Sequence, residues 1–128
     1  DELQPLCLEQ QVGVINFYAL AAGFLTGKYR SEADASKSAR GAKTVEKYLN
    51  PRGLRILAEL DEVAERYEAT PGQVAIAWQM AQPGITAPIA SATSLEQLQH
   101  LVRAAHLQLD ADALEALSQA SEESPAEA

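Results

Sequence analysis

The sequence VGVINFYALAAGFLTGKY, residues 12–29, decides the fold class of this chain. Residues 12–17 are rich in β-branched and aromatic side chains, which is typical of a short buried strand. The strand leads directly into a turn that holds Gly23, Thr26, Gly27 and Lys28. Glycine permits close backbone approach, threonine can donate a hydrogen bond and lysine brings a positive charge. This turn therefore predicts an anion site, with a phosphate-bearing ligand as the first hypothesis.

Basic residues are concentrated at and just beyond this turn. Eight of the ten Lys and Arg residues lie in residues 28–55, together with only three acidic residues, although the whole chain has a formal net charge of −8. A nucleic-acid-binding domain usually carries a net positive charge and aromatic side chains for stacking, whereas aromatics make up only 5% of this chain. The composition disfavours nucleic acid as a partner and favours a small phosphorylated cofactor.

Length and composition are those of one modest domain, with 128 residues of which 47% are hydrophobic. No apolar run approaches the roughly 20 residues that span a bilayer, and no signal peptide is recognisable, so we expect no membrane partner and a cytoplasmic location. The single Cys7 excludes an internal disulfide and is expected on a packed helix face. Because the chain begins with Asp1 and its only methionine is Met80, we expect it to be a piece of a longer polypeptide.

Two short strands are predicted among several helices. A helix over residues 3–10, packed through its leucines, precedes the strand at 12–17, and a second buried strand is expected over residues 85–90. Residues 29–48 are polar without clear periodicity and are predicted to form a long loop. Residues 121–128 are predicted to be a disordered tail. Four later helices are expected, and their predicted N-caps are Asn50, Thr70, Ser94 and Asp110.

A second anion site is predicted where the second strand ends, because residues 91–97 form the start of a helix. Generic phosphate motifs do not explain the pair of sites. The segment from Gly23 to Gly27 is one residue too short for the nucleoside triphosphatase loop, Tyr29 replaces its hydroxyl, and no G-x-G-x-x-G is present. Phosphate sites after two successive strands are instead typical of the last strands of (β/α)8 barrels. Two strands alone cannot bury all the apolar faces, so we expect partner strands from outside this segment.

Three segments together resemble the C-terminal part of the aldo-keto reductase family: LAAGFLTGKY (20–29), QVAIAW (73–78) and IASATSLEQL (89–98). The resemblance implies an α/β fold, in which residues 1–120 form the C-terminal part of a (β/α)8 TIM barrel with extra helices, incomplete as a stand-alone barrel. It also implies an NADPH-dependent oxidoreductase that reduces aldehydes or ketones to alcohols. NADH is less favoured as the cofactor, and no metal is implied.

The same resemblance implies which residues bind the cofactor. The loop after strand seven would grip the pyrophosphate, an arginine would fold over the dinucleotide, and the helix start after strand eight would lie near the adenosine. The implied cofactor-binding residues are Phe17, Tyr18, Leu20, Gly23, Thr26, Lys28, Arg40, Ser91, Thr93 and Gln97. Two departures from the family stand out: Tyr18-Ala19 replaces serine-proline, and His100-Leu101 replaces a glutamate-asparagine pair that meets adenine. We interpret His100 itself as a solvated side chain.

The catalytic tyrosine, lysine, aspartate and histidine of the family lie in its N-terminal half, so no catalytic residue is assigned here. Tyr29, Tyr48 and Tyr67 lack the neighbouring lysine and aspartate that would make a tyrosine an acid at neutral pH. This chain alone is predicted to be inactive, with the missing half of the barrel and a small carbonyl substrate as its partners. Two alternatives remain open: a non-catalytic nucleotide-sensing or partner-binding subunit, and a helical interaction domain with a structural glycine loop.

Overall fold

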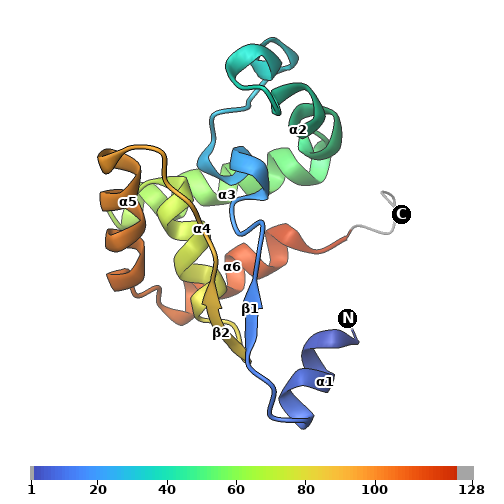
Figure 1. The fold of residues 1–128 in the computed structure, drawn as a ribbon, viewed down its shortest axis with the longest axis vertical. Coiled ribbons are helices and arrows are strands. Elements are labelled where there is room, and N and C mark those ends of the chain that lie inside the picture. The colour runs from blue at the N-terminus through green and yellow to red at the C-terminus, as the bar shows by residue number, and fades with distance from the viewer. Residues whose placement is uncertain (1, 124–128) are drawn as a thin grey trace.

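The computed structural model describes residues 2–123, which are mostly helical and include one small parallel sheet (Figure 1). None of the described helices is both long and apolar enough to cross a membrane. The elements in chain order are α1 (Leu3–Glu9), β1 (Val14–Asn16), the 3-10 helices η1 (Ala21–Thr26) and η2 (Glu32–Lys37), α2 (Gly41–Tyr48), α3 (Pro51–Arg66), α4 (Pro71–Met80), β2 (Ile85–Pro88), α5 (Leu95–His106) and α6 (Ala111–Ser121).

The sheet consists of β1 and β2, which run parallel and side by side (Figure 1). Both strands are shorter than the sequence predicted, and neither is buried: Ile15 is 60% exposed and Ile89, just beyond β2, is 55% exposed. The burial prediction was wrong for the described residues because each strand pairs there with only one other strand. Two parallel strands linked through helices are consistent with part of a barrel. The paired positions are Val14 with Ile85, Ile15 with Ala87, and Asn16 with Pro88.

All four predicted N-caps are confirmed. Each cap side chain accepts a hydrogen bond from the backbone N–H three residues later, which satisfies one of the unpaired donors at a helix start. At Ser94 the cap is not reciprocal, because the side chain of Gln97 accepts hydrogen bonds from Thr93 and not from the backbone of Ser94. The confirmed caps are Asn50, Thr70, Ser94 and Asp110.

The hydrophobic core lies among η1, α3, α4 and α6. The apolar stripe of α3 faces this core, as its helical spacing predicts, and α4 packs between α3 and α5. A second, smaller cluster joins α4 to α5 through Ile76 and Ala104. These contacts fix the starts of α4 and α5 relative to η1. The largest fully buried side chains are Tyr29, Phe24, Leu57 and Val74.

The segment predicted as a long loop, residues 29–48, contains η2 and α2 instead. A capping box between Ser31 and Asp34 starts η2. Helix α2 buries Thr44 and Val45 against the rest of the chain. The prediction failed because both helices are short, so that neither covers enough turns to show a periodic apolar stripe.

Both ends of the chain also differ from prediction. Helix α1 forms, but it buries none of its residues, and Leu3 remains 70% exposed. Cys7 is half-buried instead of lying on a packed face. Helix α6 extends through Ser121, which the sequence assigned to the disordered tail. Residues 124–128 of that predicted tail lie outside the described residues.

Candidate functional site

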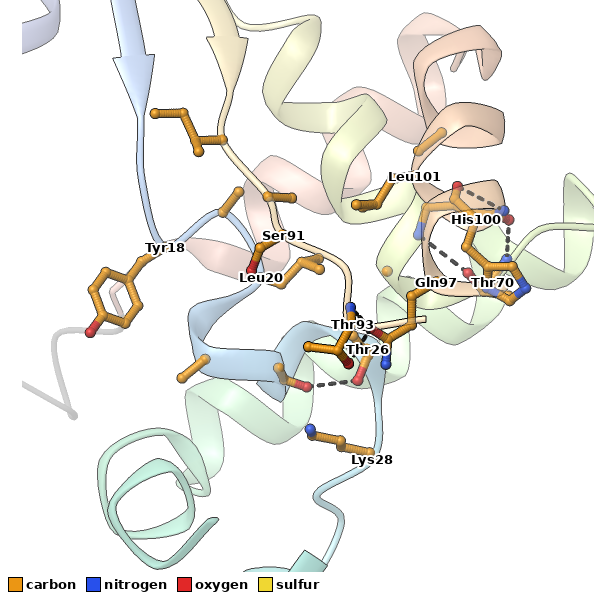
Figure 2. A pocket seen from close by; sticks show the side chains of 18 of the residues that line it. Tyr18, Leu20, Thr26, Lys28, Thr70, Ser91, Thr93, Gln97, His100 and Leu101 are labelled. Carbon is orange, nitrogen blue, oxygen red and sulfur yellow. Dashed lines mark hydrogen bonds between the residues drawn. The ribbon is translucent and has the colours of Figure 1, made fainter. Parts of the chain in front are cut away.

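A pocket of about 840 Å³ opens beyond the C-terminal ends of both strands. One wall consists of the segment after β1, including η1, and the opposite wall consists of the segment after β2 and the first turns of α5 (Figure 2). The start of α4 closes the pocket between them. We call these the β1 wall and the β2 wall. Parallel strands expose their carboxyl ends at the same edge, so the topology brings the two predicted anion sites into one pocket.

All ten predicted cofactor-binding residues line this pocket, although they are spread along the chain from Phe17 to Gln97. The structure thus brings the predicted set together, and its binding role stays a prediction. The β1 wall carries Phe17, Tyr18, Leu20, Gly23, Thr26, Lys28 and Arg40, and the β2 wall carries Ser91, Thr93 and Gln97.

The β1 wall is shaped by a run of left-handed backbone conformations. Ala22 and Gly23 have φ values of 56° and 92°, and Gly27 ends η1 with a φ of 80°. These values are strained for alanine but ordinary for glycine, and they turn the chain back over the pocket. The hydroxyl of Thr26 donates to the Gly23 carbonyl oxygen at 2.7 Å. Thr26 therefore uses its proton to hold the turn, and its oxygen still has a lone pair for a ligand donor.

Lys28 lies directly over Gly23. A Cβ atom added at Gly23 would lie 2.8 Å from the Lys28 Cε and 3.0 Å from its Nζ. The absence of a side chain at Gly23 is therefore what gives the ammonium its place on the wall. The same Nζ lies 5.0 Å from the centre of the Tyr29 ring, within the range of a cation–π contact.

The two cations of the pocket, Lys28 and Arg40, have no acidic partner among the described residues. Other basic side chains of the same region do: Arg30 pairs with Asp61, and Lys37 pairs with Asp34. Positive charges that line a pocket attract an anionic ligand more strongly when no neighbouring carboxylate neutralises them.

Tyr29 stands directly behind Lys28 and is fully buried. Its hydroxyl lies 2.6 Å from the hydroxyl of Ser38. The hydrogen bond with Ser38, assisted by the positive charge of Lys28, lowers the pKa of Tyr29 from its ordinary value, although burial acts in the opposite direction. Tyr29 is not among the residues that line the pocket.

The β2 wall presents neutral polar groups. The Gln97 side-chain oxygen accepts hydrogen bonds from the Thr93 backbone N–H at 2.8 Å and from the Thr93 hydroxyl at 3.1 Å (Figure 2). Since the oxygen of Gln97 is occupied, its NH₂ group is the part left to donate to a ligand. The hydroxyl of Ser91 lies on the same wall.

The position of His100 differs from the prediction. It is half-buried and lines the pocket one turn after Gln97, whereas the sequence indicated a solvated side chain. The Gln73 side chain donates to the His100 carbonyl oxygen at 3.2 Å and so ties α4 to α5. The spacing of three residues from Gln97 on a helix places both on one face and could have revealed this position.

The start of α4 is the part of the site that sequence reasoning missed. Thr70 and Gln73 form a reciprocal capping box, and Gly72 adds a surface without a side chain. Nothing in the local sequence indicates that this helix start faces the pocket, because that placement depends on how α4 packs between α3 and α5. The lining residues around the starts of α4 and α5 that the sequence did not predict as cofactor-binding are Thr70, Gly72, Gln73, His100, Leu101 and Ala104.

Comparison with known proteins identifies the family of the chain. The sequence model of the aldo/keto reductase family matches residues 1–122. An uncharacterized oxidoreductase of Mycobacterium tuberculosis is 36% identical over 126 residues, which cover 94% of this chain and 37% of that protein.

Two further relatives carry more specific names. An aldo-keto reductase [NADP(+)] of Schizosaccharomyces pombe is 28% identical over 95 residues, 73% of this chain and 28% of that protein. A probable voltage-gated potassium channel subunit beta of Arabidopsis thaliana is 34% identical over 108 residues, 80% of this chain and 33% of that protein. The chain spans about a third of the length of such relatives. The chain belongs to the aldo/keto reductase family.

Proposed function

We propose that the pocket binds NADPH and that the full-length protein is an oxidoreductase that reduces aldehydes or ketones to alcohols. The observation that carries the proposal is that one pocket brings together neutral donors of the β2 wall and two cations, Lys28 and Arg40, which have no acidic partner among the described residues. A dinucleotide has anionic phosphates near its middle and neutral rings at its ends, which suits such a distribution of charge.

Each part of the pocket then has a task toward the cofactor. Lys28 and Arg40 would bind the phosphates by charge-assisted hydrogen bonds, and Gly23 leaves room for the approach. Thr93 and Gln97 would hold the adenosine half at the start of α5. The exposed rings of Phe17 and Tyr18, which meet edge to face at a centroid distance of 5.1 Å, would pack beside the nicotinamide half.

When bound, the nicotinamide supplies the hydride for carbonyl reduction, and this chain supplies binding and orientation. A general acid for the carbonyl oxygen is also required, and we propose that it comes from the other part of the barrel. A chain of residues 1–128 alone is then expected to be inactive. The same reasoning makes the remaining barrel strands the partner of the exposed β1 and β2.

The first experiment titrates the full-length protein with NADPH and follows carbonyl-dependent loss of NADPH absorbance with a panel of aldehydes and ketones. Saturable binding with turnover of at least one carbonyl supports the proposal. Tighter binding of NADPH than of NADH would support recognition of the 2′-phosphate. Absence of any dinucleotide binding would contradict the proposal.

A second function deserves the same assay, because one relative is named as a potassium channel subunit beta. A non-catalytic, nucleotide-sensing or partner-binding subunit would need the same pocket. It predicts saturable NADPH binding with no turnover of any carbonyl in the panel. The helical interaction domain, in contrast, predicts no dinucleotide binding at all.

A further inference from the structure

One connecting segment separates Lys28 from Arg40. We call residues 30–40 the strap; it begins directly after Tyr29 and ends at Arg40, the N-cap of α2. The spacing between the two cations on the β1 wall is therefore set by how the two ends of the strap are held together.

The strap is braced by its own polar groups. The Asp34 carboxylate accepts hydrogen bonds from the backbone N–H of Arg30 at 2.8 Å and of Ser31 at 2.9 Å, and it pairs with Lys37 at 2.7 Å. Lys37 also donates to the carbonyl oxygen of Lys28 at 2.9 Å. This network ties the first half of the strap to the residue that carries the first cation.

A second tie attaches the strap to the core helix α3. The guanidinium of Arg30 donates two hydrogen bonds to the Asp61 carboxylate, at 2.7 and 2.8 Å. A bidentate pair of this kind fixes orientation as well as distance. The beginning of the strap therefore has a defined place on the protein.

Two side-chain hydrogen bonds hold the end of the strap: the hydroxyl of Thr44 donates to the Arg40 carbonyl oxygen at 2.9 Å, and Ser38 contacts Tyr29. Ser38, two residues before Arg40, meets the fully buried Tyr29 with 2.6 Å between the hydroxyl oxygens, and either hydroxyl can donate. A phenylalanine would fill the same core space, but a buried hydroxyl is costly without a partner. The ring of Tyr29 therefore fills the core, and its hydroxyl makes the hydrogen bond with Ser38.

This hydrogen bond joins the residue next to Lys28 to the residue two positions before Arg40. We infer that Tyr29 and Ser38 are positioning residues, which hold Lys28 and Arg40 together on the β1 wall as one two-cation site for the phosphates of the cofactor. The inference rests on the proposed function, because it assigns these residues a task in cofactor binding.

A double-mutant cycle in the full-length protein tests this role, with NADPH as the titrant. Tyr29→Phe and Ser38→Ala each remove the hydrogen bond, and we expect NADPH affinity to fall about fivefold, the scale of one net hydrogen bond. In a protein that already carries Arg40→Ala, there is no longer an arginine to position. Either change should then lower the logarithm of the NADPH affinity by less than about half as much as in the wild type. Ser38→Thr keeps the hydroxyl and should retain wild-type affinity.

Ser36→Ala is the matched control, because Ser36 lies on the same strap and, within residues 2–123, its hydroxyl bonds only to the Ala33 carbonyl oxygen. It should leave NADPH affinity unchanged. Thermal unfolding of every variant establishes that it folds, and Ser38→Ala supplies the test if Tyr29→Phe does not fold.

The outcomes separate this inference from the proposed function. If wild-type protein binds NADPH and Tyr29→Phe weakens binding equally with and without Arg40, the positioning role is overturned while the proposed function stands. Unchanged affinity in both Tyr29→Phe and Ser38→Ala overturns it as well. If the wild-type protein itself does not bind NADPH, the proposed function fails and the inference fails with it.

Discussion

The two walls of the pocket differ in charge and in how they are built. The β1 wall presents Lys28 and Arg40 on a turn with left-handed backbone and a braced strap. The β2 wall presents hydroxyl, amide and imidazole groups at the start of a regular helix, α5. A helix start offers backbone donors with little strain, whereas the charged wall needs glycines and a polar network to hold its cations.

This difference assigns different parts of binding to the two walls. Charged groups contribute most of the electrostatic attraction for a phosphate, and that attraction weakens in salt. Neutral hydrogen bonds contribute less affinity and depend weakly on salt. The β1 wall should therefore determine affinity, and the β2 wall should adjust which nucleotide fits.

Removal of both cations of the β1 wall should have the largest effect on NADPH binding. Lys28→Ala combined with Arg40→Ala should weaken NADPH binding by about 2.8 kcal/mol, or roughly 100-fold, because two charge-assisted hydrogen bonds are lost. Calorimetric titration of the full-length protein measures the change. Lys43→Ala, on the exposed face of α2 and outside the pocket, is the control and should bind like wild type. Equal affinity of the double variant and the control would dismiss the β1 wall as the source of affinity.

A subtler change to the same wall is Gly23→Ala. The positive φ of 92° strains an alanine, and the new Cβ would displace the Lys28 ammonium. We expect a stability loss of about 1 to 2 kcal/mol and roughly tenfold weaker NADPH binding.

Gly84→Ala separates strain from lysine displacement. Gly84 also has a positive φ, of 81°, but its added Cβ would meet Leu8, and neither residue lines the pocket. It should lower the thermal midpoint without changing NADPH affinity. Loss of affinity in Gly84→Ala would mean that general destabilisation, and not the position of Lys28, explains the Gly23 result.

The β2 wall should respond more weakly. Gln97→Ala removes a neutral donor, so we expect about threefold weaker NADPH binding, with the same loss at low and high salt. Gln99→Ala, exposed on the same helix and outside the pocket, serves as the control. A loss that disappears at high salt would show that this wall acts through charge, contrary to the comparison.

The smallest expected effect is the pH dependence of stability that Asp34 gives to the strap beside the β1 wall. Hydrogen bonds from Lys37 and from the Arg30 backbone hold the pKa of Asp34 well below its ordinary value of 3.8. A depressed carboxyl pKa means that the ionised form stabilises the fold above 3.8, and that this stabilisation is lost as pH falls through the depressed value.

Asp34→Asn should therefore lower the thermal midpoint slightly at neutral pH and converge with wild type in acid. Thermal unfolding at a series of pH values from about 7 down to about 1 measures this convergence, because the stabilisation is lost mainly below 3.8. Glu32→Gln removes a carboxylate from the same segment without breaking the Asp34 bonds and is the control. Parallel curves for wild type and Asp34→Asn would show that Asp34 does not brace the strap through its charge.

Much of the fold was predictable where a local signal is strong. The caps at Asn50, Thr70 and Asp110 carry their own hydrogen bonds, so the sequence alone identifies these helix starts. Helix α2 was missed because two turns show little periodicity, although the Ser31 and Asp34 capping box marks the preceding η2. The exposure of Ile15 was missed because burial of a strand depends on neighbours that the local sequence does not describe.

The site shows the same division. The ten expected residues meet in one pocket because parallel strands deliver their following loops to one edge. His100 and the Thr70 to Gln73 turn were not predicted, since their approach to the pocket depends on how α4 packs against α5. The hydrogen bond between Tyr29 and Ser38 joins residues nine positions apart without helical or strand periodicity, so only the structure reveals it.

The proposed function requires the β1 wall to supply the charge that binds the cofactor. The most direct test measures the salt dependence of NADPH affinity for wild type and for the Lys28→Ala, Arg40→Ala double variant, from about 50 to 500 mM salt. We predict that wild-type affinity falls steeply with salt and that the double variant changes much less. The same salt dependence in both proteins would show that Lys28 and Arg40 do not supply that charge.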